Sequence, residues 1–382
     1  PLRLVGSEMC IRDRVKAFIA NHNIKFYTID GVKIGIETGM GPTRINTILQ
    51  SAFFKLTGII PEEQAIELMK AAAKATYGRK GDKIVQMNYD AIDAGAKQVV
   101  EIEVPESWKS CEDEGLFTPE VKGGKDDVVA FVKNIQSKVN AQEGNTLPVS
   151  TFTDYADGST PSGSAAYEKR GIAVDIPVWQ SENCIQCNRC AYVCPHAVIR
   201  PVALTEEELA KAPEGTEAID MIGMPGLKFT MTVSAYDCTG CGSCANVCPV
   251  NNAGKKAPAL VMTSFDDETA KEQEKYDYLV QLAEKQEVLD KFKISTVKGS
   301  QFRKPYLEFS GACAGCGETP YAKLATQLFG DRMYIANATG CSSIWGGSSP
   351  STPYTIDVNG HGPAWANSLF EDNAEYGLGM FI

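Results

Sequence analysis

The chain has 382 residues and a formal net charge of −11, from 37 lysines and arginines and 48 aspartates and glutamates. This acidic balance, without a basic cluster, argues against nucleic-acid binding, and no apolar stretch reaches the roughly 20 residues of a membrane span. Thirteen cysteines, with no signal-peptide pattern at the start, predict a cytoplasmic protein in the reducing interior of an anaerobe.

Residues 1–14 show neither helix nor strand periodicity, and we interpret them, with Cys10, as a non-native leader. The chain starts at Pro1 and stops at Ile382 without a charged tail, which favours an internal piece of a larger protein. Its length allows about two to four domains.

The segment 15–104 has the pattern of an α/β domain. We expect two short strands within 25–36, because Val32, Ile34 and Ile36 alternate with other residues. Three helices and a strand come next, expected at about 45–57, 61–77, 82–95 and 100–104.

The segment 105–180 has a weaker pattern. We expect one helix over 126–140, where four aliphatic residues recur at helical spacing. Residues 141–164 are rich in Gly, Ser, Thr and Pro, which predicts an extended connector across a surface. Cys111 has no assigned role, and a buried free thiol is the default for such a cysteine.

Two cysteine tetrads are the strongest signal in the chain. Each has the spacing C-x2-C-x2-C-x3-C-P, which wraps a [4Fe–4S] cluster in bacterial ferredoxins. In two-cluster ferredoxins the fourth cysteine of each motif ligates the other cluster, so we expect an exchange between the tetrads. The expected ligands are Cys184, Cys187, Cys190 and Cys248 for the first cluster, and Cys238, Cys241, Cys244 and Cys194 for the second.

Zinc sites and disulfides are the alternatives to clusters. Zinc uses separated C-x2-C pairs, whereas here three cysteines share each short spacing and the pattern occurs twice. Disulfides between such close cysteines would form strained rings. We therefore expect an inserted two-cluster, ferredoxin-like α+β domain over 181–298.

Three features of this domain lie outside the cysteines. Thr205 and Glu208 predict a capping box on a short helix, and a strand is expected over 229–233. Residues 266–290 predict one charged helix with a solvated face. His196, which follows the first tetrad, is interpreted as a packed residue rather than one that tunes a cluster.

A third, incomplete cysteine site lies in the last segment, 299–382. Cys313 and Cys316 form a C-x2-C pair, and Cys341 follows later. Because three cysteines cannot complete a four-thiolate cluster, either a fourth ligand lies beyond the chain, or Cys111 folds back, or the three are a redox dithiol or ordinary thiols. The chain has neither a P-loop nor the glycine motif of a nicotinamide-binding fold.

The same segment again has an α/β pattern. We expect a helix that Thr319 and Pro320 cap, that carries Leu324 and Leu328 and that ends at Gly330, and then a strand over 333–336.

In their order along the chain, these motifs resemble pyruvate:ferredoxin (flavodoxin) oxidoreductase over nearly all of residues 15–382. Glu168-Lys169-Arg170 resembles the EKR signature of that family, and the ferredoxin module follows it as expected. The segments 311–355 and 362–380 resemble the start of its thiamine-binding domain. The resemblance implies a gamma-type domain remnant, an EKR linker domain, a ferredoxin-like domain and the start of a thiamine pyrophosphate domain, at 15–104, 105–180, 181–298 and 299–382.

The resemblance also implies a chemistry for the parent enzyme. It would oxidise pyruvate with coenzyme A to acetyl-CoA and carbon dioxide, using thiamine pyrophosphate and Mg²⁺, and pass electrons through [4Fe–4S] clusters to ferredoxin or flavodoxin. In the family, residues that match Cys313, Cys316 and Cys341 hold a proximal cluster whose fourth ligand comes much later. Residues that match Glu318 and Cys341 contact the thiamine cofactor.

No catalytic residue is assigned within this chain, so the fragment alone is expected to be inactive on pyruvate. Two other functions stay open, namely another 2-oxoacid:ferredoxin oxidoreductase and a standalone two-cluster electron-transfer protein. The family is generally dimeric, which implies a homodimer by analogy.

Overall fold

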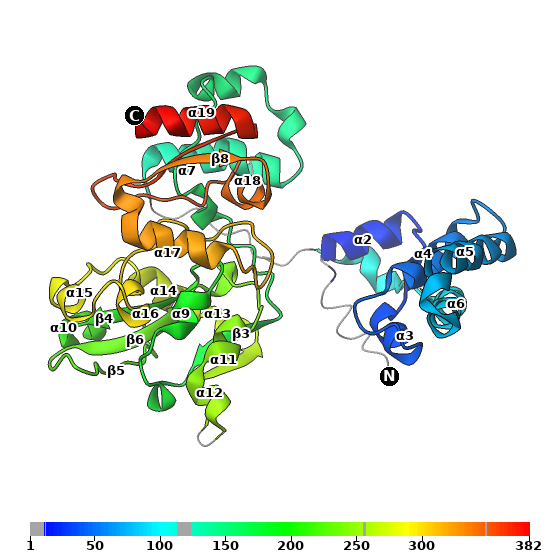
Figure 1. Cartoon of the computed structure of the whole chain (residues 1–382), viewed down its shortest axis with the longest axis horizontal. Helices are drawn as coiled ribbons and strands as arrows, with labels where there is room; N and C mark the ends of the chain where they lie inside the picture. The colour runs from blue at the N-terminus through cyan, green and yellow to red at the C-terminus, as the bar shows by residue number, and fades with distance from the viewer. Residues whose placement is uncertain (1–10, 12, 113–123, 255–256, 348–349) are drawn as a thin grey trace. The chain divides into compact units, whose positions relative to one another are not determined.

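The computed structural model describes residues 11, 13–112, 124–254, 257–347 and 350–382. The chain divides into two compact units, Pro1–Thr118 (unit 1) and Pro119–Ile382 (unit 2), and each is described by itself (Figure 1). Most of the expected leader, including Cys10, lies outside the described residues. In the described ranges we find no helix with the length and apolar character that a membrane span requires.

Unit 1 is mainly helical and contains one antiparallel strand pair. The strands β1 (Phe26–Thr28) and β2 (Val100–Ile102) pair with Phe26 opposite Ile102. The helical elements are α2 (Asp13–Asn21), α3 (Gly31–Glu37), α4 (Asn46–Thr57), α5 (Glu62–Tyr77), η1 (Gly78–Lys80), α6 (Asp82–Lys97) and η2 (Glu106–Ser110). Helices α4, α5 and α6 confirm the three expected from the sequence.

The second strand expected within 25–36 is wrong, because that stretch is the helix α3. The Asp30 carboxylate accepts a hydrogen bond from the backbone N–H of Lys33 at 2.9 Å and so caps the helix. Ile34 is 1% exposed, but Val32 and Ile36 are 47% and 59% exposed. The alternation of apolar and other residues over so short a stretch therefore did not indicate a strand with one buried and one exposed face.

Helices α4 and α6 pack closely, and small residues permit the approach. A Cβ added to Gly95 would lie 2.4 Å from the carbonyl oxygen of Ile48. Ser51 Oγ donates to the carbonyl of Ile92 at 2.6 Å across the same contact. Ile48 and Ile92 are fully buried there.

Unit 2 begins with one helical run, α7 (Asp126–Phe131), η3 (Val132–Gln136) and α8 (Ser137–Asn140), which confirms the helix expected over 126–140. Short turns follow in the expected connector, at η4 (Gly144–Thr146), η5 (Val149–Tyr155) and η6 (Ser164–Tyr167). Unit 2 contains two antiparallel sheets, with the strand orders β3-β7 and β4-β6-β5. The strands are β3 (Asp175–Trp179), β4 (Ile199–Leu204), β5 (Ile219–Asp220), β6 (Lys228–Val233) and β7 (Leu260–Ser264).

Short helices connect these strands. Those within the dicluster region are η7 (Ser181–Asn183), α9 (Arg189–Val193), α10 (Glu206–Ala210), η8 (Ala235–Asp237), α11 (Ser243–Val247) and α12 (Pro249–Ala253). The capping box predicted at the start of α10 is present, with Thr205 and Glu208 each bonded to the other's backbone N–H. Both sheets flank the two cysteine tetrads.

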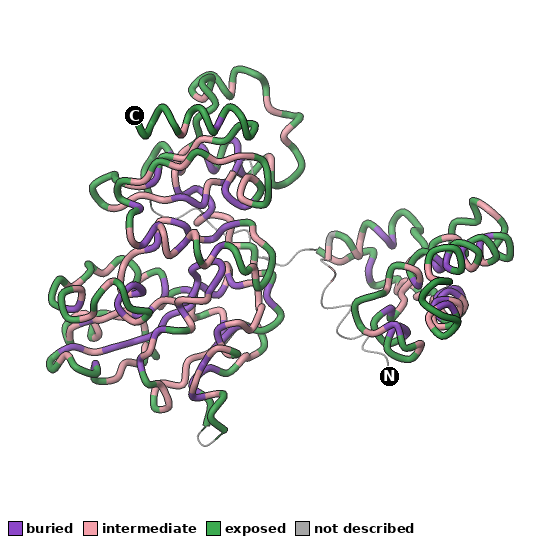
Figure 2. Tube along the Cα trace, in the orientation of Figure 1, coloured by how far each residue is buried: buried purple, intermediate pink, exposed green. Residues whose placement is uncertain are grey.

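Strand β6 is the centre of the core of unit 2 (Figure 2). Its expected inward residues Phe229 and Val233 are at most 1% exposed, but Thr230 and Thr232 are buried as well. Because helix α14 (Glu272–Leu279) contacts this strand, neither face of β6 is left to solvent.

The single charged helix expected over 266–290 is wrong in its length and in its environment. The chain instead forms α13 (Asp267–Ala270), α14 and α15 (Gln286–Lys291). Tyr276 and Leu279 on α14 are 3% and 1% exposed, so α14 packs on the sheet rather than presenting only a solvated face. The many charged residues of this stretch hid the apolar face of α14 from a prediction based on sequence.

The last part of unit 2 contains a parallel strand pair, β8 (Tyr334–Ala338) and β9 (Ala364–Ser368), with Tyr334 opposite Ala364. The expected strand at 333–336 is thus confirmed. The helical elements of this part are α16 (Val297–Ser300), α17 (Thr319–Phe329), η9 (Gly330–Arg332), α18 (Cys341–Gly346) and α19 (Phe370–Phe381).

Candidate iron–sulfur sites

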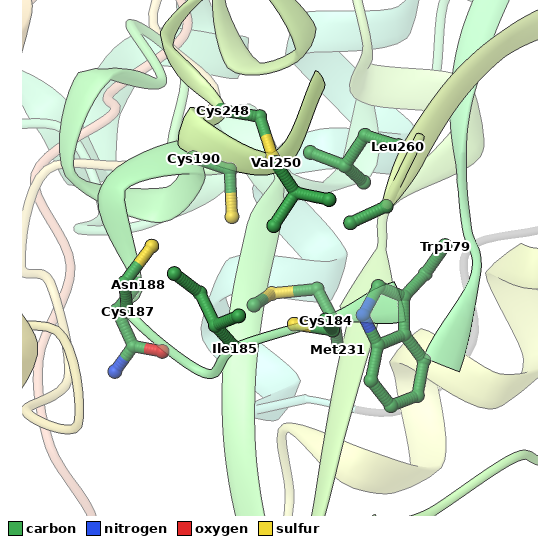
Figure 3. A pocket seen from close by; sticks show the side chains of 11 residues that line it. Trp179, Cys184, Ile185, Cys187, Asn188, Cys190, Met231, Cys248, Val250 and Leu260 are labelled. Carbon is green, nitrogen blue, oxygen red and sulfur yellow. The ribbon is translucent and has the colours of Figure 1, made fainter. Parts of the chain in front are cut away.

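The first expected ligand set converges on one pocket. Cys184, Cys187, Cys190 and Cys248 line the same cavity, and their side chains are grouped around one space (Figure 3). Cys248 comes from the second tetrad and lies 58 positions after Cys190 in the sequence, so the structure brings distant residues together. The remaining lining is largely apolar, from Trp179, Ile185, Met231, Val250, Ala259 and Leu260.

The second expected set is also held together in the core. Burial, together with nearby Cys194, raises the pKa of Cys238 and of Cys244 to about 12. Cys241 lies close enough to Cys238 and Cys244 to raise their pKa values as well. Cys194 comes from the first tetrad, so this group mirrors the exchange seen in the first pocket.

The two half-motifs share one backbone conformation. Gln186 and Gly240 occupy the same motif position and have φ of 54° and 67°. Each donates its backbone N–H to the sulfur two residues earlier, at 3.4 Å in both cases. The next left-handed position is Asn188 in one half and Gly242 in the other, with φ of 60° and 73°.

Side-chain hydrogen bonds hold the two non-glycine residues in this unfavourable conformation. Gln186 is 1% exposed; its Nε2 donates to the carbonyl of Asp220 at 2.8 Å, and its Oε1 accepts from Ile222 N–H at 2.8 Å. Asn188 is also 1% exposed and donates to the carbonyl of Lys298 at 3.0 Å. These contacts fix the first ligand loop to β5 and α16, and the sequence pattern alone did not reveal them.

The donor set and its surroundings fit [4Fe–4S] clusters. Each group offers four sulfur atoms, and burial raises the pKa of Cys184 and Cys190 as well as that of Cys238 and Cys244. Buried thiols with raised pKa values become ligands when cationic iron replaces their protons. Within the described ranges, no group of three or more His, Cys, Asp or Glu side chains is arranged to hold a single metal ion.

The third cysteine site is only partly assembled. Cys313 and Cys341 are exposed and Cys316 is half-buried. The N–H of Cys316 donates to the Cys313 carbonyl at 3.0 Å and closes a turn. A Cβ added to Gly315, in this turn, would lie 3.7 Å from the Cβ of Cys241, so the third loop packs beside the second ligand set.

Glu318 lies close to the helix that begins with Cys341. The indole Nε1 of Trp345, on α18, donates to Glu318 Oε2 at 3.1 Å. This bond brings the two expected thiamine contacts, Glu318 and the start of α18, into one region of unit 2.

His196 joins the first tetrad to the third loop. It is 3% exposed, burial lowers its pKa, and its Nε2–H donates to the Ala312 carbonyl at 2.9 Å. The His196 carbonyl in turn accepts from the N–H of Phe309 at 2.9 Å. These bonds agree with the interpretation of His196 as a packed residue.

The EKR signature connects three segments of unit 2. Glu168 accepts hydrogen bonds from Ser351 Oγ and from Asn140 Nδ2. Lys169 Nζ contacts Asp237 Oδ2 at 2.5 Å and lies 4.7 Å from the ring centroid of Phe309. Because Asp237 precedes Cys238, the motif anchors the second ligand loop.

Comparison with known proteins matches three family models to segments of the chain. A family described as pyruvate ferredoxin/flavodoxin oxidoreductase matches residues 5–98, a 4Fe-4S dicluster domain matches 182–252, and the EKR domain, of unknown function, matches 119–173. The pyruvate:ferredoxin oxidoreductase of Moorella thermoacetica is 54% identical over 370 residues, which are 96% of this chain. By sequence, the chain belongs to the pyruvate:ferredoxin (flavodoxin) oxidoreductase family.

Two further relatives are similar over nearly the whole chain. The pyruvate-flavodoxin oxidoreductase of Enterobacter agglomerans is 52% identical over 96% of the chain, and the pyruvate dehydrogenase [NADP(+)] of Cryptosporidium parvum is 47% identical over 97%. The chain spans 30% of the length of the Moorella and Enterobacter relatives and 20% of the Cryptosporidium one. Its fold is thus a mixture of helices and strands that contains a dicluster domain and part of an oxidoreductase domain.

Proposed function

We propose that the chain is the electron-relay part of a pyruvate:ferredoxin (flavodoxin) oxidoreductase. The convergence of Cys184, Cys187 and Cys190 with Cys248 on one apolar pocket carries this proposal. The names of the relatives support pyruvate as the substrate and ferredoxin or flavodoxin as the electron acceptor. Coenzyme A as co-substrate, a homodimeric state and a cytoplasmic location stay predictions.

Two cubane clusters would be held by the ligand sets already described. When bound, such clusters supply one-electron chemistry, with potentials set by burial and by hydrogen bonds to sulfur. The chain's own residues provide both influences. Trp179, Val250 and Leu260 line the first pocket with apolar groups, while Gln186 and Gly240 donate N–H groups to Cys184 and Cys238.

A third cluster is proposed to be bound by Cys313, Cys316 and Cys341. The proposed contacts of thiamine pyrophosphate and its Mg²⁺ are Glu318 and Cys341. The packing of Gly315 against Cys241 and the Trp345–Glu318 hydrogen bond support this grouping. We also propose the finer domain division at 15–104, 105–180, 181–298 and 299–382.

Anaerobic reconstitution of the 382-residue chain with iron and sulfide tests the relay. Two filled clusters correspond to about eight iron atoms per chain, and a third raises the number to about twelve. We expect a brown protein that dithionite reduces reversibly and that then reduces ferredoxin or flavodoxin. A colourless protein that retains zinc instead of iron would refute the proposal.

A further inference from the structure

Helix α17 buries polar side chains more deeply than its leucines. Lys323 and Thr326 are 2% and 1% exposed, whereas Leu324 and Leu328 are only partly buried. The positions of the leucines in the sequence did not indicate which face of this helix is buried. Lysine is rarely buried to this extent without partners, so its position calls for a specific electrostatic explanation.

The partners of Lys323 are backbone carbonyls around the end of helix α9. Its Nζ donates to the carbonyl oxygens of Ala191, Tyr192 and Cys194, the last two at 3.1 Å. These three bonds use all the donors of the ammonium group. The chain that they hold carries both Cys190 and Cys194.

No acidic side chain in the described part of the chain forms an ion pair with Lys323. Burial lowers its pKa to about 8, the charges of Cys194 and Cys190 oppose this change, and Arg200 reinforces it. Lys323 thus lies beside one cysteine of each expected ligand set, because it is bonded to the carbonyl of Cys194 and to that of Ala191, the neighbour of Cys190. A carboxylate partner would have neutralised the ammonium locally, whereas carbonyl dipoles leave its positive charge in place.

We propose that Lys323 is a positioning residue shared by both clusters, which fixes the Cys190–Cys194 turn and places one uncompensated positive charge between the two ligand sets. The inference rests on the proposed function, because it requires clusters at both sets. Reduction adds one electron, and so one negative charge, to a cluster. A buried cation at short range favours the more negative form, and Lys323 therefore makes both clusters easier to reduce.

Redox titration of the reconstituted 382-residue chain with dithionite at constant pH, followed by electron paramagnetic resonance, tests this role. Lys323→Gln keeps a hydrogen-bond donor but removes the charge, and Lys323→Arg keeps the charge. The matched control is Lys211→Gln, because Lys211 is exposed at the end of α10.

We expect Lys323→Gln to make both clusters about tenfold harder to reduce, which for a one-electron couple corresponds to about 59 mV. Lys323→Arg should restore most of this change, and Lys211→Gln should leave both potentials at the wild-type values. If Lys323→Gln loses iron while Lys323→Arg retains it, this result also shows that the sites require a positive charge at position 323.

Three results would overturn the role of Lys323. These are unchanged potentials in Lys323→Gln, a change in only one cluster, and equal loss of iron in the Gln and Arg variants, which would indicate a packing role. If the wild-type chain itself binds no iron, the proposed function fails instead, so the two failures are distinguishable.

Discussion

Cys194 and Cys248 are each the last cysteine of one tetrad in the chain but lie with the cysteines of the other tetrad in space. Cys248 lines the pocket of Cys184, Cys187 and Cys190, and Cys194 influences the pKa of Cys238 and Cys244. A ligand assignment made separately for each tetrad would therefore differ from one based on the structure. Substitution of a single cysteine can distinguish them.

We predict that Cys248→Ala removes the cluster that Cys187→Ala also removes, and leaves the cluster that requires Cys241. Iron should fall from about eight to about four atoms per chain. Iron analysis with paramagnetic resonance of the reduced protein measures both effects. Cys111→Ala, in unit 1, is the control and should leave the iron content unchanged. Loss of the Cys241-dependent signal in Cys248→Ala would contradict the exchange.

The ion pair of Lys169 and Asp237 gives the EKR signature a structural role. Asp237 is buried, with its side chain 4% exposed, and also accepts from Ser234 Oγ at 2.6 Å. Burial raises its pKa, while Lys169 opposes the change. Removal of the lysine alone would leave a buried carboxylate without its cation.

We predict that Lys169→Met lowers the free energy of unfolding of unit 2 by about 3 kcal/mol. The double variant Lys169→Met/Asp237→Asn should recover part of this loss, because the buried charge is then absent. Denaturant unfolding followed by circular dichroism measures both variants. Equal stability of the single variant and the wild type would argue against an anchoring role.

At the level of elements, the longer helices could be predicted and the short ones could not. Helices α4, α5 and α6 carry a repeated apolar stripe over 12 to 16 residues, which periodicity detects. Helix α3 has seven residues, and its formation depends on the Asp30 cap rather than on a stripe. The buried face of α17 could not be predicted, because its partners are the carbonyls near α9. Ala191, for example, precedes Lys323 by 132 positions.

The close contact of α4 and α6 predicts a specific effect of a methyl group. Gly95→Ala should lower the stability of unit 1 by about 1–3 kcal/mol, because the added Cβ meets backbone atoms of Ile48. The matched control is Gly78→Ala, at the end of α5, where a Cβ meets nothing within 4 Å and the backbone φ is −54°. That variant should be neutral or more stable by about 0.4–1 kcal/mol. Thermal unfolding of both variants checks the difference.

Helix α10 predicts a pH dependence. Burial alone would raise the pKa of Glu208, but hydrogen bonds from Lys285 and from the N–H of Thr205 lower it overall from 4.5. Its charged form therefore stabilises the fold above that pH, and the contribution is lost as the pH falls through the lowered pKa.

We predict that Glu208→Gln lowers stability by about 1 kcal/mol at pH 7, and that the difference from the wild type shrinks in acid. Unfolding measured across this pH range provides the comparison. Glu207→Gln, on the exposed neighbour, should show no such dependence. A deficit that grows in acid would have the wrong sign for this mechanism.

In the whole molecule, all eight cysteines of the two expected ligand sets lie in unit 2. Their spacing predicted the ligands, because [4Fe–4S] motifs are local in sequence. The residues that support them could not be predicted in this way. Gln186, Asn188 and Lys323 act through contacts with segments far along the chain.

We predict that residues 119–382, expressed alone, bind as much iron as the whole chain, about eight atoms if two clusters form. The reason is that unit 2 contains both ligand sets and the side chains that support them. Iron analysis and redox titration of the two proteins in parallel test this. A lower iron content in the shorter protein would mean that unit 1 contributes to the sites.

The pairing of β3 with β7 has a consequence for the chain on either side of the dicluster portion. Asp175 lies opposite Ser264, and the two tetrads are contained between these strands. The dicluster portion therefore leaves the rest of the chain at nearly the point where it enters. The residues at which the chain enters and leaves this portion are thus held next to each other, and a change in the length of the portion would not separate them.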